Sequence, residues 1–318
     1  MIFQCHDLTI HLDSPDSPIQ AAWRELLRGW LQEGTPAAPD VRLALRLADQ
    51  WPPPTGPLLY SDQEAHPERP SILDVYDLGA GAVQLHFHGA AQINLSLRQT
   101  AGVPTAEGVM RPEALGNGRF EDITYTSLAP LLRRRGYFLL HAFAAAKEGR
   151  AALLVGASGS GKTTSGLSLL LAGWELLSND VVLLQMRPDG VYALPTPDSV
   201  SIRPYSLTLL PALREWLPGW TGERPFTVSA YELINGRWAA PTPIRAIYFP
   251  KIETRSTSAL SPLPRATTLA RLMEESVDQW DAPLLTAHLT ILQAISQQAD
   301  SYLLQLNQNP ASVPALLS

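Results

Sequence analysis

The chain has 318 residues, of which 45% are hydrophobic and 17% are charged, and its formal net charge is −6. This hydrophobic content can supply a substantial core and excludes an intrinsically disordered protein. The basic residues cluster only in the run 133–135, so the sequence gives no electrostatic footprint for nucleic acid.

The first residues, MIFQCHDLTI, carry neither a basic start nor a long apolar segment, and no later run approaches the roughly 20 apolar residues of a membrane-spanning helix. Cys5 is the single cysteine, which excludes an intrachain disulfide and a cysteine metal site. We therefore expect a cytoplasmic protein with no membrane partner and no nucleic-acid partner.

Residues 1–125 favour a mixed α/β domain to which no role can be assigned from the sequence. Strand-like patterns cover 2–12, 41–47, 72–78, 82–88 and 91–97, a helical pattern covers 19–31, and a proline-rich loop covers 51–70. His86 and His88 lie two apart on one expected strand face and could bind a metal, although no third ligand is visible. Two ordinary strand histidines are the alternative.

Residues 126–318 favour a second α/β domain. A helix is expected over 122–135, and 137–156 is expected to form two strands joined by the turn KEGR. Further patterns indicate a helix over 162–172, one or two strands over 174–186, a strand over 241–250, helices over 267–277 and 284–298, and a strand over 301–306.

The stretch GASGSGKTT, residues 156–164, follows an apolar strand-like run and leads into the expected helix 162–172. It fits the phosphate-loop (Walker A) pattern G-x-x-x-x-G-K-[ST] in the required order of strand, loop and helix. The residues expected to bind nucleotide phosphates are Gly156, Ala157, Ser158, Gly159, Ser160, Gly161, Lys162, Thr163 and Thr164.

The chemistry of a phosphate chain explains this pattern. Glycines let backbone N–H groups approach the phosphates, and the following helix presents the positive end of its dipole. Lys162 places a charge near the β- and γ-phosphates, and the Thr163 hydroxyl can ligate Mg²⁺. The cofactors that the loop predicts are therefore ATP and Mg²⁺. A plain glycine-rich turn is the structural alternative.

The stretch from His141 to Asp180 resembles the catalytic core of bacterial HPr serine kinase/phosphorylase, within the phosphoenolpyruvate carboxykinase-like phosphate-loop folds. His141 stands 15 residues before Gly156, as the family histidine does, and an acidic pair of the family corresponds to Asn179 and Asp180. The resemblance implies an HPr-kinase-like domain over 126–318, with a mixed sheet and C-terminal helices. The sequence is similar to a divergent group of HPr-kinase-related proteins that includes peptide-tailoring kinases. The resemblance also implies a homo-oligomer.

The resemblance implies a catalytic set of His141, Lys162, Asn179 and Asp180, with Thr163 and Asp180 as metal ligands. In the family the first aspartate of the pair is the proposed general base, and here it is Asn179, whose amide cannot usefully accept a proton near neutral pH. The base assignment therefore stays open: His141 is a candidate base or a donor to the γ-phosphate, and a packed strand histidine is the alternative. Asp180 could instead be an ordinary turn or cap aspartate.

Two arginines are further candidates for binding substrate or phosphate. Arg203, in SIRP at 201–204, matches the arginine of the family signature E-[IV]-R-G, and Arg255 ends the segment PKIETR. Exposed surface arginines are the alternative for both.

Three functions are consistent with these residues. The first is an ATP- and Mg²⁺-dependent kinase that phosphorylates a serine-type hydroxyl of a peptide, protein or small molecule. The second is an ATP-binding regulatory or scaffold protein, which Asn179 favours because it removes the expected base. The third is an ATPase motor or transport subunit, but Asp180 follows Lys162 by only 18 residues and no LSGGQ-like signature is present.

Overall fold

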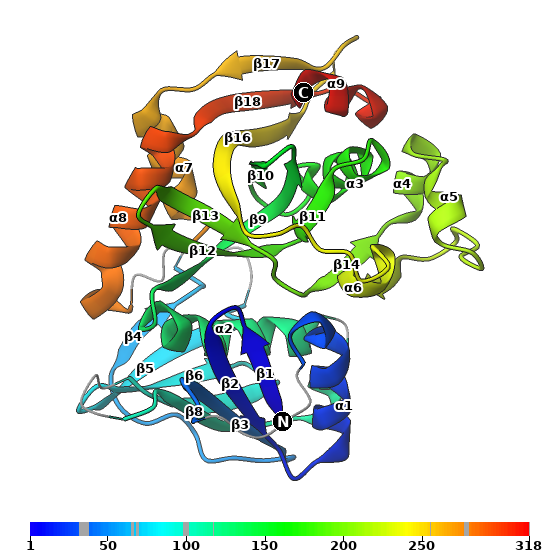
Figure 1. Cartoon of the computed structure of the whole chain (residues 1–318). Helices are drawn as coiled ribbons and strands as arrows, with labels where there is room; N and C mark the ends of the chain where they lie inside the picture. The colour runs from blue at the N-terminus through cyan, green and yellow to red at the C-terminus, as the bar shows by residue number, and fades with distance from the viewer. Residues whose placement is uncertain are drawn as a thin grey trace. The chain divides into compact units, whose positions relative to one another are not determined.

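The structure is a computed structural model that describes residues 1–31, 38–64, 67, 70–97, 102–116, 118–254, 256–276 and 280–317. The chain divides into two compact units. The first comprises Met1–Tyr137 with Asp278–Leu285, and the second comprises Phe138–Val277 with Thr286–Ser318. The boundary expected after residue 125 lies inside helix α2 (Arg119–Arg133). Each unit is described by itself below and can be followed in Figure 1.

Within the described residues, the first unit forms a sheet of eight strands in the order β1-β2-β3-β8-β7-β6-β5-β4. The strands are β1 (Ile2–Cys5), β2 (Leu8–Asp13), β3 (Val41–Leu47), β4 (Leu58–Ser61), β5 (Leu73–Gly79), β6 (Ala82–Phe87), β7 (Ala91–Ser96) and β8 (Thr105–Met110). The helices are α1 (Ser17–Leu26), α2 (Arg119–Arg133) and the short 3₁₀ turns η1 (Arg28–Trp30) and η2 (Pro112–Leu115).

The sheet of the first unit buries one face. In β3 the residues Val41, Leu43 and Leu45 are buried while Arg42 and Arg46, on the opposite face, are exposed, which is the two-residue period of a strand with one covered face. The helices α1 and α2 are joined by Trp23, whose Nε1 donates to Thr124 Oγ1 at 3.3 Å. The run 41–47, which was expected to be a strand, is therefore a strand with one buried face.

Three expectations for the first unit were wrong in detail. The run 2–12 is a hairpin rather than one strand, because His6 has a positive φ of 59° and turns the chain. The expected loop 51–70 contains β4, and β8 was not expected at all. In β8, Gly108 interrupts the apolar alternation, yet a Cβ there would lie 2.7 Å from Ile93 Cγ1, so close strand packing requires the glycine.

The second unit is built on a mixed sheet with the strand order β10-β9-β12-β13-β16-β18-β17, in which β11 also pairs with β9. The strands of the mixed sheet are β9 (Tyr137–Lys147), β10 (Arg150–Val155), β11 (Glu175–Ser178), β12 (Val181–Arg187), β13 (Gly190–Leu194), β16 (Thr242–Ile252), β17 (Ala259–Pro262) and β18 (Asp300–Leu306). The strands β14 (Ser199–Ile202) and β15 (Phe226–Ser229) pair with each other in a separate two-stranded sheet. Strand β10 is antiparallel to β9 and parallel to β16.

The helices of the second unit cover both faces of this sheet (Figure 1). They are α3 (Lys162–Leu171), α4 (Pro204–Leu209), α5 (Leu213–Trp216), α6 (Ala230–Leu233), α7 (Arg265–Glu274), α8 (Ala282–Gln298), α9 (Val313–Leu317) and the 3₁₀ turn η3 (Pro310–Ser312). Alternate residues of β9 enter two different cores. Ala142 and Ala144 pack in the core that contains α7 and α8 residues, whereas Phe143 packs in the core that contains α3.

These observations confirm the predicted fold class: an α/β protein with an N-terminal mixed α/β unit and a second unit with a mixed sheet and C-terminal helices. Within the described ranges, every helix is too short or too polar to cross a bilayer.

Candidate functional site

The glycine-rich loop connects the end of β10, at Val155, to the start of α3, at Lys162. Residues 157–159, in the middle of the loop, are exposed, so the loop backbone is accessible to a ligand there. Gly161 has a φ of 106°, and a Cβ at this position would lie 2.7 Å from Leu306 Cδ1. Both the conformation and the close packing therefore require glycine immediately before the helix.

Lys162 is only 6% exposed, and its ammonium group is folded back onto its own loop. Its Nζ donates to the carbonyl oxygens of Gly156 and of Ala157, the latter at 3.3 Å, and lies 2.9 Å from His141 Nε2. Burial lowers the pKa of Lys162 below its ordinary range, while the carboxylates of Asp180 and Glu275 oppose that change.

His141 lies on β9 between a cation and a carboxylate. Its Nδ1 is 3.5 Å from Asp180 Oδ1, on the side of the ring away from Lys162. The backbone holds this arrangement in register, because Ala142 N donates to the Asp180 carbonyl at 2.9 Å. The side chains of His141 and Asp180 are 33% and 45% exposed, so both are accessible to a ligand.

The turn that carries Asp180 is fixed by a buried carboxylate that sequence reasoning missed. Asp198 Oδ2 accepts from Ser178 Oγ at 3.0 Å, from Asn179 N at 2.7 Å and from Asp180 N at 2.8 Å. Asp198 is 1% exposed and precedes β14 in a proline-containing connection. No motif marks it in the sequence, because the contact joins two segments whose pairing depends on the tertiary fold.

Asn179 faces the protein interior. It is 5% exposed, and its Nδ2 donates to the Ser199 carbonyl at 2.9 Å. Its Oδ1 is buried and lacks a hydrogen-bond partner among the described residues. The side-chain amide of Asn179 therefore links the 178–180 turn to the first residue of β14.

The two threonines of the loop differ in their surroundings. Thr164 Oγ1 is 3.2 Å from Ser206 Oγ on α4, whereas Thr163 is partly exposed in the first turn of α3 beside Lys162. A threonine hydroxyl and a carboxylate are oxygen donors of the kind that Mg²⁺ takes alongside water and phosphate, so Thr163 and Asp180 fit this ion in their chemistry. The described residues contain no cluster of three or more His, Cys, Asp or Glu side chains that could hold a metal by itself.

The remaining candidates stay separate from this cluster. Arg203 is exposed at the start of α4. Arg255 lies outside the described residues, so its predicted role is untested. The structure therefore brings together His141, Lys162 and Asp180, places Asn179 beside them facing inward, and shows no contact of Arg203 with them.

Comparisons with known proteins add little to this geometry. No protein-family model matches the sequence, and no curated protein matches it. Among solved structures, the HPr(Ser) kinase/phosphatase from Coxiella burnetii is 12% identical, and the alignment covers 56% of this chain and 93% of that chain with a TM-score of 0.29. A similarity at this level carries no argument about function, so the interpretation rests on the site itself.

Glu275 is a further acidic residue of this site that sequence reasoning missed. It follows α7 directly, and its carbonyl oxygen accepts a hydrogen bond from His141 N at 3.2 Å. Burial raises the pKa of Glu275 above its usual range, and His141 and Lys162 oppose that rise. In the sequence Glu275 looks like an ordinary polar residue at the end of an amphipathic helix.

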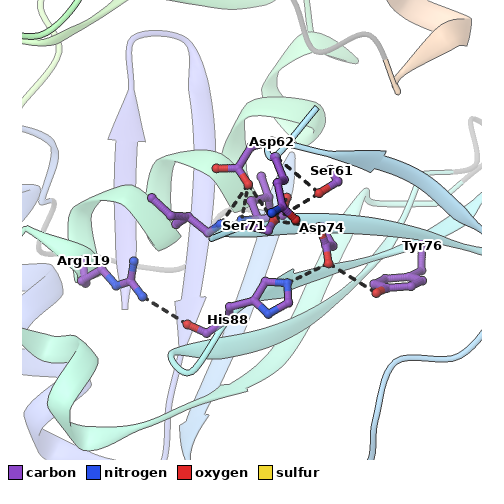
Figure 2. A network of polar contacts seen from close by, with 10 residues as sticks. Ser61, Asp62, Ser71, Asp74, Tyr76, His88 and Arg119 are labelled. Carbon is purple, nitrogen blue, oxygen red and sulfur yellow. Dashed lines mark hydrogen bonds and ion pairs between the residues drawn. The ribbon is translucent and has the colours of Figure 1, made fainter. Parts of the chain in front are cut away.

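The first unit holds a separate polar network, which Figure 2 shows. His88 Nε2 lies 2.7 Å from Asp74 Oδ2, and Ser71 Oγ lies 2.8 Å from Asp74 Oδ1 and 2.6 Å from Asp62 Oδ1, so its one hydroxyl proton is available to either carboxylate. Although burial acts in the opposite direction, hydrogen bonds from Ser61, His88 and Ser71 lower the pKa of Asp74. The His86 and His88 rings are 4.7 Å apart, but the described residues around them form no metal-binding group.

Proposed function

We propose that this chain is an ATP- and Mg²⁺-dependent phosphotransferase that transfers the γ-phosphoryl group to a hydroxyl of a peptide, a protein or a small molecule. The observation that carries the proposal is the meeting of Lys162, His141 and Asp180 beside a glycine-rich loop at a helix N-terminus. A cation, a proton acceptor and a carboxylate next to a phosphate-binding loop are the groups that phosphoryl transfer requires.

In this proposal the loop binds the phosphates through its backbone N–H groups and the N-terminus of α3. Lys162 leaves the carbonyls of Gly156 and Ala157 for the β- and γ-phosphates. Thr163 and Asp180 would hold Mg²⁺, which supplies charge neutralisation when bound.

His141 is the proposed proton acceptor. Once Lys162 has moved to the phosphates, the Nε2 of His141 is free to take the proton of the acceptor hydroxyl. The hydroxyl oxygen then bonds to the γ-phosphorus, and the bond from that phosphorus to the bridging oxygen breaks, so that ADP leaves with the electron pair. Asp180, beside Nδ1, stabilises the charged imidazolium that results.

A regulatory or scaffold protein that binds ATP is the second candidate. Asn179 favours this candidate, because its side chain is buried, donates a hydrogen bond to the Ser199 carbonyl and cannot act as a base. In such a protein, nucleotide binding would change the structure without transfer.

The experiment that tests the proposal follows the γ-phosphate of labelled ATP into a panel of serine-containing peptides and into water. Lys162→Ala should abolish both transfer and ATP-dependent thermal stabilisation, whereas the control Lys147→Ala, at the end of β9, should keep them. Binding without transfer or hydrolysis would favour the scaffold. Unchanged ATP binding by Lys162→Ala would contradict the loop assignment.

A further inference from the structure

A pocket of about 580 Å³ lies on the sheet of the first unit. All of its lining residues belong to that unit, and its volume is within the range of ligand pockets. Part of the lining comes from Ala44 on β3, Glu107 on β8 and Asn94 on β7, which are cross-strand partners. Because paired residues point to one face of a sheet, these side chains share the face opposite to the buried Leu43 and Ile93.

Trp51 supplies an aromatic surface of the pocket. It lies in the loop after β3 and is partly exposed. The guanidinium of Arg111, which is outside the lining, lies 5.6 Å from the centroid of the Trp51 ring. A cation over the face of an aromatic ring is attracted to it, so this contact favours one orientation of the indole. The pocket therefore offers a flat apolar surface that is oriented before a ligand binds.

Asn94 supplies hydrogen-bond donors. Its Oδ1 accepts from Gln84 Nε2 at 2.8 Å, and Gln84, on β6, is 5% exposed and lies outside the lining. Since the oxygen of this amide is bonded to the buried Gln84, the Nδ2 group of the exposed Asn94 presents its N–H donors to a ligand. A side chain whose orientation is held by a buried partner is typical of a preorganised binding site.

The charged groups of the pocket balance one another. Asp13 Oδ2 accepts from Arg42 Nε at 2.8 Å, so this lining carboxylate is paired within the protein. Two further lining side chains, Arg46 and Glu107, are exposed and carry opposite charges. A carboxylate only accepts hydrogen bonds, whereas a guanidinium and an amide nitrogen only donate them. A matching ligand is therefore uncharged overall and carries groups that both donate and accept, as hydroxyls do.

We propose that the first unit binds a neutral, polyhydroxylated ligand of the sugar class in this pocket. The carbon-bound hydrogens of the sugar ring pack on the Trp51 indole, and its hydroxyls bond to Asn94, Arg46 and Glu107. A zwitterionic amino acid or dipeptide also matches the two opposite charges, but it offers no ring face to the indole. The proposal does not depend on phosphoryl transfer, because no residue of the phosphate loop lines the pocket.

Saturation-transfer NMR on the full chain tests the ligand class. The probes are glucose, galactose, mannose, N-acetylglucosamine, maltose and lactose, and glycine and glycylglycine represent the zwitterions. We expect saturation transfer to the ring protons of at least one sugar and none to the two zwitterions. Transfer to no sugar of this panel, or to the zwitterions alone, would overturn the proposal.

Two tryptophan variants locate the binding site. In Trp51→Ala the Kd of the sugar that binds should rise at least about tenfold, because the surface that packs on the sugar ring is removed. Trp216→Ala removes an exposed indole from α5 of the second unit and should leave the Kd unchanged. Titration of the saturation-transfer signal gives both values. An unchanged Kd in Trp51→Ala, or equal losses in the two variants, would overturn the site.

A second variant guards against a folding defect in Trp51→Ala. Glu107→Gln changes one exposed side chain and nearly keeps its size, so we expect the fold to be kept. Its neutral oxygen is a weaker acceptor for sugar hydroxyls, and the Kd should rise about three- to tenfold. Glu113→Gln, at an exposed glutamate of η2 outside the pocket, is the matched control and should keep the wild-type Kd. Binding by Glu107→Gln at the wild-type Kd would overturn the proposed site.

Discussion

The Nζ of Lys162 lies 2.9 Å from the Nε2 of His141. An ammonium group has no lone pair, so the imidazole nitrogen must accept this hydrogen bond, and the proton of the neutral ring then resides on Nδ1, facing Asp180. The basic nitrogen of His141 is thus occupied by the lysine that ATP phosphates would attract. We infer that phosphate binding and release of the proton acceptor are coupled through Lys162.

His141→Ala should lower transfer by about 10²- to 10⁴-fold, the range typical of a lost general base, and should leave ATP binding nearly intact. Initial rates across pH, with ATP affinity measured by calorimetry, check this prediction. Wild-type rates at every pH would remove His141 from the mechanism.

Asn179→Asp should destabilise the protein. The new carboxylate would face the Ser199 carbonyl, to which the amide now donates at 2.9 Å, so a hydrogen bond is replaced by repulsion in a buried place. We expect a loss of about 1–3 kcal/mol that is larger at neutral than at acidic pH, because only the ionised form is penalised.

Urea unfolding of Asn179→Asp at about pH 5 and about pH 8 measures this difference. Unchanged stability together with faster transfer would mean that residue 179 faces the acceptor and can serve as the base. That result would contradict the inward orientation of Asn179.

Asp198→Ala should destabilise the second unit by about 2–4 kcal/mol, because three donors of the 178–180 turn lose a shared acceptor in the interior. Transfer should fall as well, since Asp180 is no longer held. Asp300→Asn, at an exposed aspartate at the start of β18, is the control and should unfold like the wild type. Denaturant midpoints of the two variants provide the measurement, and equal midpoints would contradict the anchoring role.

Glu275→Gln should make the protein more stable than the wild type above about pH 5. The folded-state pKa of Glu275 is raised by burial, so its contribution to stability is fully present below the unfolded-state pKa and is lost as pH rises through the folded-state value. Glutamine carries no such penalty. Thermal unfolding of wild type, Glu275→Gln and Glu274→Gln across pH checks the sign; a wild type that gains stability over the variant with rising pH would contradict it.

The sequence indicated the parts of the site that follow local rules. The loop 156–164 and helix α3 have a fixed pattern, and the resemblance to the HPr kinase core pointed to His141, which contacts Lys162, and to Asp180, which lies beside His141. Asp198 and Glu275 could not be found in this way, because each reaches the site from a distant segment. Their contacts depend on strand order and helix placement rather than on local periodicity.

The same distinction applies to the strands. Strands β9 and β10 are continuous apolar runs joined by a glycine turn, and they were predicted. The strands β4 and β8 carry little alternation, and they exist because neighbouring strands offer hydrogen-bonding edges. Whether such segments form strands therefore depends on the tertiary fold.

The attachment of the 178–180 turn to Asp198 orders the backbone of Asp180 before any ligand binds. Fixing a backbone residue costs about 1–2 kcal/mol of conformational entropy, and a flexible turn would lose that entropy when a ligand arrives. Here the three hydrogen bonds to Asp198 Oδ2 form within the protein itself, so the turn is ordered at folding. A ligand of Asp180 therefore meets a pre-ordered carboxylate, and its binding free energy is not reduced by ordering this turn.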